Sequence, residues 1–283
     1  MPYPYTIRIF VPNGDPDGIR TIEKSNWSGS GLVFPRALFS EAKSRTELAK
    51  TGVYVLLGPP EDSGLRTVYI GEGDPIKNRL ESHAKYKEFW QTCVVFTSKD
   101  QNLNKAHVQY IESRLYSLAA TAKRCVLDNG NSPQLPSMSE SDAADAEGFL
   151  AEMLLCFPII GIHVFTLSEP ARSSLIEYSV SGRGITARGV ETPQGFVVWS
   201  GSTAALQVVP SCHTYLVDLR TALVENGVLL EKDGALLFTQ DYVFASPSTA
   251  AGVVLGRSSN GREEWKTKKG QTLKSVQSGD TVL

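Results

Sequence analysis

Residues that could act together on a phosphate ester are spread between positions 54 and 112. They are Tyr54, Tyr69, Arg79, His83 and Glu112. Because Arg79 and His83 are four residues apart, their side chains would point the same way on a helix. Arginine is a forked cationic donor for phosphate oxygens, histidine titrates near neutral pH, and glutamate can hold a hard divalent cation. Together these groups could hydrolyse a phosphodiester.

Each of these residues also has an ordinary structural explanation. A tyrosine in a strand usually packs against neighbouring strands, and arginine or glutamate on a helix is usually a solvated charge. A single histidine is most often a surface residue. The functional interpretation therefore depends on the five residues occurring in this order on elements that can bring them together.

The elements expected around these residues form a small mixed unit of two strands, a helix, a strand and a long helix. Alternating apolar residues predict a hairpin from the strands GVYVLLG and TVYIGEG. Asp74 is expected to cap a helix that has Pro75 at its first position. TCVVFTS is the third strand, and an amphipathic helix over residues 103–123 places Glu112 at the border of its apolar face.

The two tripeptides GVY at 52–54 and YIG at 69–71 resemble the signature of the GIY-YIG nuclease superfamily. Arg79 lies at the arginine position of that family on the next helix, and His83 lies where several members carry a histidine. The family places its metal-binding glutamate where Glu112 stands. Many members have an asparagine in the region of Asn129 or Asn131, although the spacing from Glu112 is long.

The resemblance implies an α+β GIY-YIG nuclease domain over residues 51–135 that hydrolyses phosphodiester bonds in DNA. Tyr54 would orient or deprotonate the attacking water, His83 is a competing base, and Arg79 would bind phosphate oxygens. Glu112 would hold one Mg²⁺ or Mn²⁺ ion. The complete implied catalytic set is Tyr54, Tyr69, Arg79, His83, Glu112 and Asn129, and Lys77 is an expected nucleic-acid contact. Two alternatives stay open: an inactive DNA-binding or scaffold protein, and an RNA-directed nuclease.

The remainder of the chain is expected to form three further segments. Residues 1–50 should form a β/α extension, with strands over 5–11 and 19–24 and a helix over 34–50. Residues 136–167 should be a linker containing a helix that ends near Pro158. Residues 168–283 should be an α+β module of short strands joined by glycine turns, with helices.

The C-terminal run FTQDYVFASPSTAAGVVLGRSSNGREEWK resembles DUF4357 and the related RAMA domains. The resemblance implies a role in choosing a DNA target. A basic edge with an aromatic residue suits backbone contacts and base stacking. The expected nucleic-acid contacts in this module are Arg257, Arg262, Trp265, Lys266 and Lys268. A solvated rim with Trp265 in the core is the competing explanation.

The composition is that of a globular protein, since 41% of the 283 residues are hydrophobic and 20% are charged. The formal net charge of −2 argues against a non-specific coat on nucleic acid but permits a local basic patch. Four cysteines without CxxC spacing indicate free thiols. With no long apolar stretch, we expect a cytoplasmic protein without membrane contact, in a setting such as restriction or phage defence. Cutting both DNA strands would need a homodimer or two successive nicks.

Overall fold

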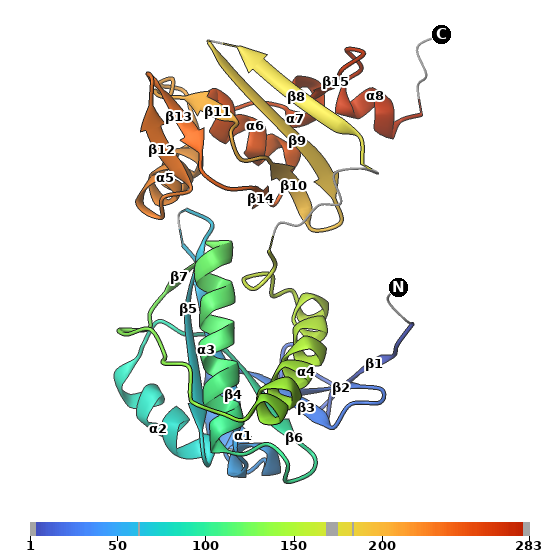
Figure 1. The fold of residues 1–283 in the computed structure, drawn as a ribbon, viewed down its shortest axis with the longest axis vertical. Coiled ribbons are helices and arrows are strands. Elements are labelled where there is room, and N and C mark those ends of the chain that lie inside the picture. The colour runs from blue at the N-terminus through green and yellow to red at the C-terminus, as the bar shows by residue number, and fades with distance from the viewer. Residues whose placement is uncertain (1–3, 62, 168–174, 183, 280–283) are drawn as a thin grey trace. The chain divides into compact units, whose positions relative to one another are not determined.

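A computed structural model describes residues 4–61, 63–167, 175–182 and 184–279. The chain divides into two compact units (Figure 1). Unit 1 comprises Met1–Pro60 and Arg66–Thr166, and unit 2 comprises Glu61–Leu65 and Leu167–Leu283. The expected module boundary at residue 168 lies outside the described residues. Both units mix helices and strands, so the fold class is α+β.

Unit 1 is built on a seven-stranded sheet with the order β1-β2-β3-β6-β4-β5-β7. Its strands are β1 (Ile7–Phe10), β2 (Arg20–Lys24), β3 (Gly29–Pro35), β4 (Gly52–Pro60), β5 (Arg66–Gly73), β6 (Thr92–Ser98) and β7 (Cys125–Leu127). Neighbouring strands are antiparallel except β5 and β7, which are parallel. The expected N-terminal extension therefore belongs to the same sheet as the hairpin β4–β5.

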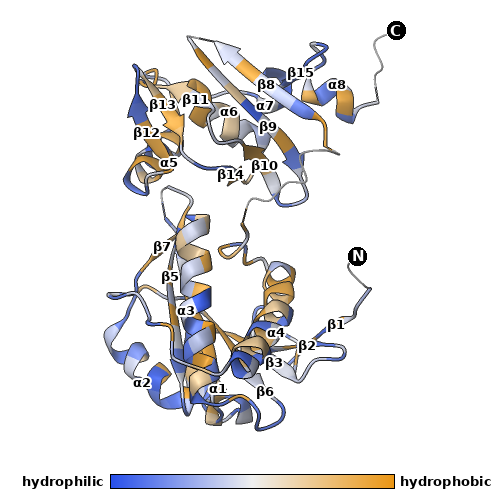
Figure 2. Ribbon diagram, in the orientation of Figure 1, coloured by the Kyte–Doolittle hydropathy of each residue, from blue (hydrophilic) through white to orange (hydrophobic). Residues whose placement is uncertain are grey.

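Helices cover both faces of this sheet, because its central strands are apolar on both sides. On one face Tyr54 and Leu56 pack with Ile76 and Leu80 of α2 (Ile76–Tyr86). On the other face Val53, Val55, Val68 and Ile70 pack with Val108, Ile111 and Leu115 of α3 (Lys105–Ala122). In Figure 2 α2 is coloured largely hydrophilic, in keeping with a helix that buries only a narrow stripe.

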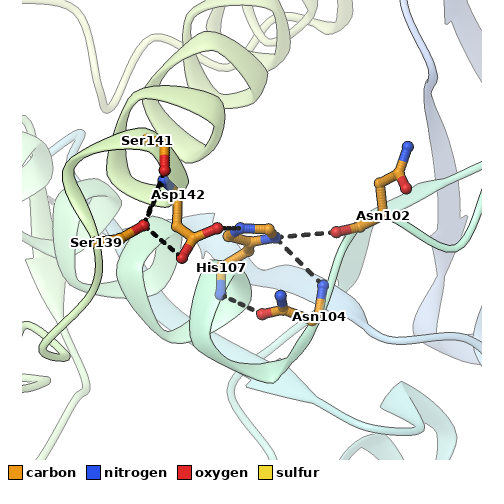
Figure 3. A network of polar contacts seen from close by, with 6 residues as sticks. All are labelled: Asn102, Asn104, His107, Ser139, Ser141 and Asp142. Carbon is orange, nitrogen blue, oxygen red and sulfur yellow. Dashed lines mark hydrogen bonds and ion pairs between the residues drawn. The ribbon is translucent and has the colours of Figure 1, made fainter.

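The start of α3 is fixed by a reciprocal cap. The side chain of Asn104 accepts a hydrogen bond from the backbone N–H of His107, and Nδ1 of His107 accepts one from the backbone N–H of Asn104. Figure 3 shows this cap together with Asp142 of α4 (Glu140–Cys156), whose carboxylate lies 3.9 Å from Nε2 of His107. His107 is 9% exposed and serves to cap the helix.

Three local predictions for unit 1 differ from the structure. The helix expected over 34–50 is reduced to α1 (Phe39–Ala42) between two 3-10 turns, because residues 29–35 form β3 instead. The Asp74 carboxylate does not cap α2, since it accepts a 2.7 Å hydrogen bond from the Thr51 hydroxyl. The helix expected within residues 136–167 is present as α4 and ends at Cys156, but it is part of unit 1 and not a linker, since Ala146, Leu150 and Met153 pack into the unit 1 core.

Unit 2 contains two small sheets with the orders β14-β10-β9-β8-β15 and β11-β13-β12. The strands are β8 (Glu177–Gly182), β9 (Ile185–Thr192), β10 (Gly195–Val198), β11 (Thr203–Ala205), β12 (Leu229–Lys232), β13 (Ala235–Phe238), β14 (Tyr242–Phe244) and β15 (Lys266–Thr267). The helices are α5 (Thr214–Glu225), α6 (Pro247–Leu255), α7 (Gly261–Glu264) and α8 (Leu273–Gln277). The run LLFTQDYVF forms two strands, β13 and β14, which are separated by a turn.

The apolar helix α6 lies at the centre of the unit 2 core, and the side chain of Ser246 caps it by accepting from Thr249 N–H. All four cysteines fall within the described residues, and each is a free thiol. Within the described ranges there is no helix with the length and hydrophobicity needed to cross a membrane.

Candidate active site

The hairpin places Tyr54 and Gly71 directly opposite each other, one on β4 and one on β5. Tyr54 is fully buried, and its ring lies over the space that a side chain at position 71 would fill. A Cβ atom at Gly71 would come within 2.4 Å of the Tyr54 hydroxyl and 2.9 Å of the Tyr69 ring. The glycine of the YIG tripeptide therefore makes room for the two tyrosines.

Tyr54 is joined to α2 by a hydrogen bond. Its hydroxyl lies 2.8 Å from Nε2 of His83. A phenol can donate and a neutral imidazole nitrogen can accept, so a proton can pass across this contact. Arg79 lies one turn earlier on α2, and its charge opposes the rise in the pKa of Tyr54 that burial causes. Tyr54 and His83 thus form a short polar chain from the core of the unit to α2.

Tyr69 lies beside this chain on β5. Its ring stacks on Tyr54 at a centroid distance of 6.2 Å and tilts against His83 at 4.6 Å. The Lys87 ammonium lies 4.5 Å from the centre of the Tyr69 ring and forms an ion pair with Asp128. Tyr69, Arg79 and His83 all retain exposed surface, so they connect the buried Tyr54 with solvent.

Glu112 comes from α3, which packs on the opposite face of the sheet from α2, and it meets the site beside Glu72 of β5. The Glu72 backbone favours the charged Glu112 carboxylate and lowers its pKa, whereas the Glu72 carboxylate raises it. The Glu72 side chain is held by Lys105, whose Nζ lies 2.6 Å from both carboxylate oxygens. Lys105 is seven residues before Glu112 and therefore lies on the same stripe of α3.

The tyrosines on one face of the sheet and Glu72 and Glu112 on the other can interact because β7, the outer neighbour of β5, is short. β7 pairs only with residues 66–68, so in the described part of the chain no strand covers the edge of β5 beyond Val68. Asn129 takes the place of a strand at Ile70, where Nδ2 donates to the carbonyl at 2.7 Å and Oδ1 accepts from the N–H at 3.1 Å. The sequence-predicted Asn129 therefore holds the backbone between Tyr69 and Gly71.

The ionisation of these groups reflects burial and their mutual charges. Burial raises the pKa of Glu112 to about 7, the nearby Glu72 carboxylate adds to this, and the Arg79 and Lys105 charges act against it. Burial lowers the pKa of His83 to about 4, and the positive charges of Arg79 and Lys87 contribute. Burial also raises the pKa of Tyr54 well above its usual value, while Arg79 opposes the increase. The charge of Arg79 thus acts on both Tyr54 and Glu112.

Glu112 and Glu72 are the carboxylates that could donate oxygen ligands at this site. The described residues contain no cluster of three or more histidine, cysteine, aspartate or glutamate side chains arranged to hold a metal ion. Mg²⁺ needs less, because it is usually bound by one or two carboxylates with water and substrate phosphate completing the shell. Glu112, with Glu72 beside it, provides such oxygen donors.

The sequence-predicted contacts in unit 2 fall into two groups. Arg262, Lys266 and Lys268 are exposed, and Arg257 is ion-paired with Glu264 at 2.6 Å. Trp265 is fully buried, packs on Phe196 at a centroid distance of 4.4 Å and donates through Nε1 to the carbonyl of Pro247. The expected stacking role of Trp265 is corrected here, since a ring enclosed in the core has no face for a base.

Several residues of the site were missed by sequence analysis. Glu72, Lys105, Lys87 and Asp128 complete the electrostatic surroundings of the tyrosines and Glu112. Glu72 follows the YIG tripeptide directly, and strand alternation assigns it to the face opposite Tyr69. Strand alternation therefore predicts that Glu72 faces α3, but its pairing with Lys105 can be recognised only in the tertiary structure. Lys77 is partly exposed on the first turn of α2.

Comparisons with known proteins identify a domain in unit 2. Residues 178–277 match the family described as a domain of unknown function (DUF4357), so this chain contains a DUF4357 domain. No curated protein and no solved structure matches the chain. The candidate site in unit 1 lies outside the matched residues.

Proposed function

We propose that unit 1 is a metal-dependent endonuclease of the GIY-YIG type that hydrolyses phosphodiester bonds in DNA. The observation that carries the proposal is the packing of Tyr54, Tyr69 and His83 around Gly71, with the Tyr54 hydroxyl 2.8 Å from Nε2 of His83. The exposed Arg79 guanidinium, one turn before His83 on α2, could bind a phosphate beside this group. Glu112 comes from α3 on the other face of the sheet.

Proton transfer would pass through the pair of Tyr54 and His83. At neutral pH His83 is uncharged and its Nε2 can accept the phenol proton. Tyr54 holds its own proton in the resting protein because burial disfavours the phenolate. Arg79 stabilises any negative charge that develops on the phenol oxygen, and a substrate phosphate would bind its exposed guanidinium. Tyr69 and the glycine at position 71 keep the pair in place.

Glu112 would hold the Mg²⁺ or Mn²⁺ ion with Glu72 beside it. A bound ion would supply Lewis-acid charge and lower the pKa of a coordinated water. Lys105 neutralises Glu72, and the charge of Glu72 contributes to the raised pKa of Glu112. The exposed basic residues of the DUF4357 domain would select or retain the DNA target.

Nicking of supercoiled plasmid DNA in the presence of Mg²⁺ tests this proposal. Wild-type protein should convert supercoiled DNA to the open circular form, and Glu112→Gln should reduce the rate by at least about 100-fold. The exposed Glu88 in the same unit supplies a matched control, and Glu88→Gln should cut like wild type. Equal absence of cleavage in wild type and Glu112→Gln, with Mg²⁺ and Mn²⁺, on single-stranded DNA, duplex DNA and RNA, would refute a nuclease.

A further inference from the structure

Tyr86, at the end of α2, presents a large aromatic surface to solvent. Its exposed fraction is 82%, the highest among the large hydrophobic residues that the structure describes. An aromatic ring has a broad face, so a ring presented in this way on an ordered element can stack on a ligand.

The position of Tyr86 on α2 relates it to the candidate site. Arg79, His83 and Tyr86 stand at i, i+4 and i+7, which places the three side chains along one stripe of the helix. His83 contacts the Tyr54 hydroxyl, so the stripe includes a residue of the site. At 1.5 Å per residue, Tyr86 lies about 10 Å along the helix from Arg79. This separation is suited to a group that neighbours the phosphate bound by Arg79.

The end of α2 is held in place, so the exposure of Tyr86 is not the result of a frayed helix. The Arg36 guanidinium donates to the carbonyl of Lys87 at 2.6 Å and to that of Ala84 at 3.0 Å. Lys87 in turn donates its backbone N–H to the carbonyl of His83 and pairs through its side chain with Asp128. An aromatic ring on a fixed support loses little conformational freedom when it binds.

We propose that Tyr86 stacks on an unpaired base next to the scissile phosphate, so the substrate of this site carries a single-stranded segment where it is cut. Bases inside a duplex have both faces covered by their neighbours, whereas an unpaired base offers a face to an aromatic side chain. The inference rests on the proposed nuclease function for the identity of the neighbouring phosphate. Binding through Tyr86 can nevertheless be measured without cleavage.

The test uses the full-length Glu112→Gln protein and short oligonucleotides that contain the fluorescent base 2-aminopurine. The same sequence is offered as single-stranded DNA, as duplex DNA and as single-stranded RNA. Adding Tyr86→Ala should weaken binding to the single strands by about 5- to 100-fold, with a much smaller effect on the duplex, and should abolish the quenching of 2-aminopurine. Tyr86→Phe should restore both, because stacking needs the ring and not the hydroxyl.

Tyr215 provides the matched control, as an exposed tyrosine in unit 2 that lies outside the site. Tyr215→Ala should leave single-strand binding within about twofold of the parent protein. Equal binding of single strands by Tyr86→Ala and its parent, or an equal loss for single strand and duplex, would overturn the inference. If wild type cuts DNA and Tyr86→Ala cuts with unchanged KM, the stacking role fails while the nuclease stands. Tyr86-dependent quenching without any cleavage by wild type would support stacking and refute the nuclease.

Discussion

The hydroxyl of Tyr54 lies 2.8 Å from Nε2 of His83, across the boundary between the central sheet and α2. Tyr54 is fully buried and His83 is partly exposed, so the contact connects the interior of unit 1 with its surface. The two groups are also matched in ionisation. The histidine is neutral and able to accept, and the tyrosine is protonated and able to donate. They should therefore act as one unit.

Replacing Tyr54 by phenylalanine should reduce the rate of cleavage and leave the fold almost unchanged. The ring remains, so the free energy of unfolding should fall by only about 1 kcal/mol for the lost hydrogen bond. The rate of DNA cleavage should fall by at least about 100-fold if the phenol takes part in proton transfer. Denaturant unfolding and single-turnover cleavage measure the two effects. Unchanged cleavage by Tyr54→Phe would assign the hydroxyl a structural role.

Adding one methyl group at Gly71 should damage the site through sterics alone. The new Cβ would lie 2.4 Å from the Tyr54 hydroxyl, which cannot move away freely because it is buried. We expect Gly71→Ala to lose about 1–3 kcal/mol of stability and most of the cleavage activity. Gly148→Ala is the control, since its Cβ would meet no atom within 4 Å and alanine favours the helix α4. Wild-type activity in Gly71→Ala would contradict the packing described here.

Asn129 should act by holding β5 and not by touching substrate. Asn129→Ala removes two hydrogen bonds to the backbone of Ile70, and we expect unfolding free energy to fall by about 1–3 kcal/mol. Hydrogen exchange at the Ile70 amide should become faster, because its acceptor is lost. A variant with wild-type stability and exchange but without cleavage would instead support the direct catalytic role predicted from the sequence.

Cleavage at limiting metal concentration should increase with pH through about 7. The charged form of Glu112 binds a cation, and its pKa is raised to about 7. Because the folded pKa lies above the usual value, this group stabilises the folded state below about 4.5, and the contribution is lost as the pH rises through 7. Glu72→Gln should move the acid limb to lower pH, and Lys105→Met should move it to higher pH. Shifts in the same direction for both variants would contradict this electrostatic arrangement.

Trp265 and Lys268 should respond differently to substitution. Trp265→Ala removes a fully buried ring from the unit 2 core, and we expect a loss of about 3–5 kcal/mol in stability. Lys268→Ala changes an exposed side chain and should leave stability within about 0.5 kcal/mol. If the basic edge contacts DNA, Lys268→Ala should also weaken binding and reduce its dependence on salt. Thermal unfolding and titrations at several salt concentrations distinguish the two roles.

Much of the fold around the site was predictable because its signals are local. Alternation in GVYVLLG and TVYIGEG predicted the hairpin, and the expected strand TCVVFTS matches β6 over Thr92–Ser98. The apolar periodicity of the long helix is also confirmed, with a start at Lys105. Ser246 and Pro247 stand at the beginning of α6, where a capping serine and a first-turn proline are favoured.

The features that were missed depend on contacts between distant residues. β3 contains two glycines, which lower strand propensity, and it is stabilised by pairing with β2 and β6 on either side. The expected helix is shortened to α1, because the residues up to Pro35 belong to that strand. At the site, the pairing of Glu72 with Lys105 joins residues 33 positions apart. Trp265 has basic neighbours in the sequence, but in the structure it packs against Phe196 of β10 and is enclosed in the core.

A crystal structure of the Tyr54→Phe protein with bound DNA and Mn²⁺ tests the central claim most directly. The account predicts one ion, located by its anomalous signal, with a Glu112 oxygen and a DNA phosphate oxygen among its ligands and with Arg79 bonded to the same phosphate. An ion bound away from Glu112, or DNA bound in this region with Arg79 and Glu112 on different phosphates and no ion between them, would contradict it.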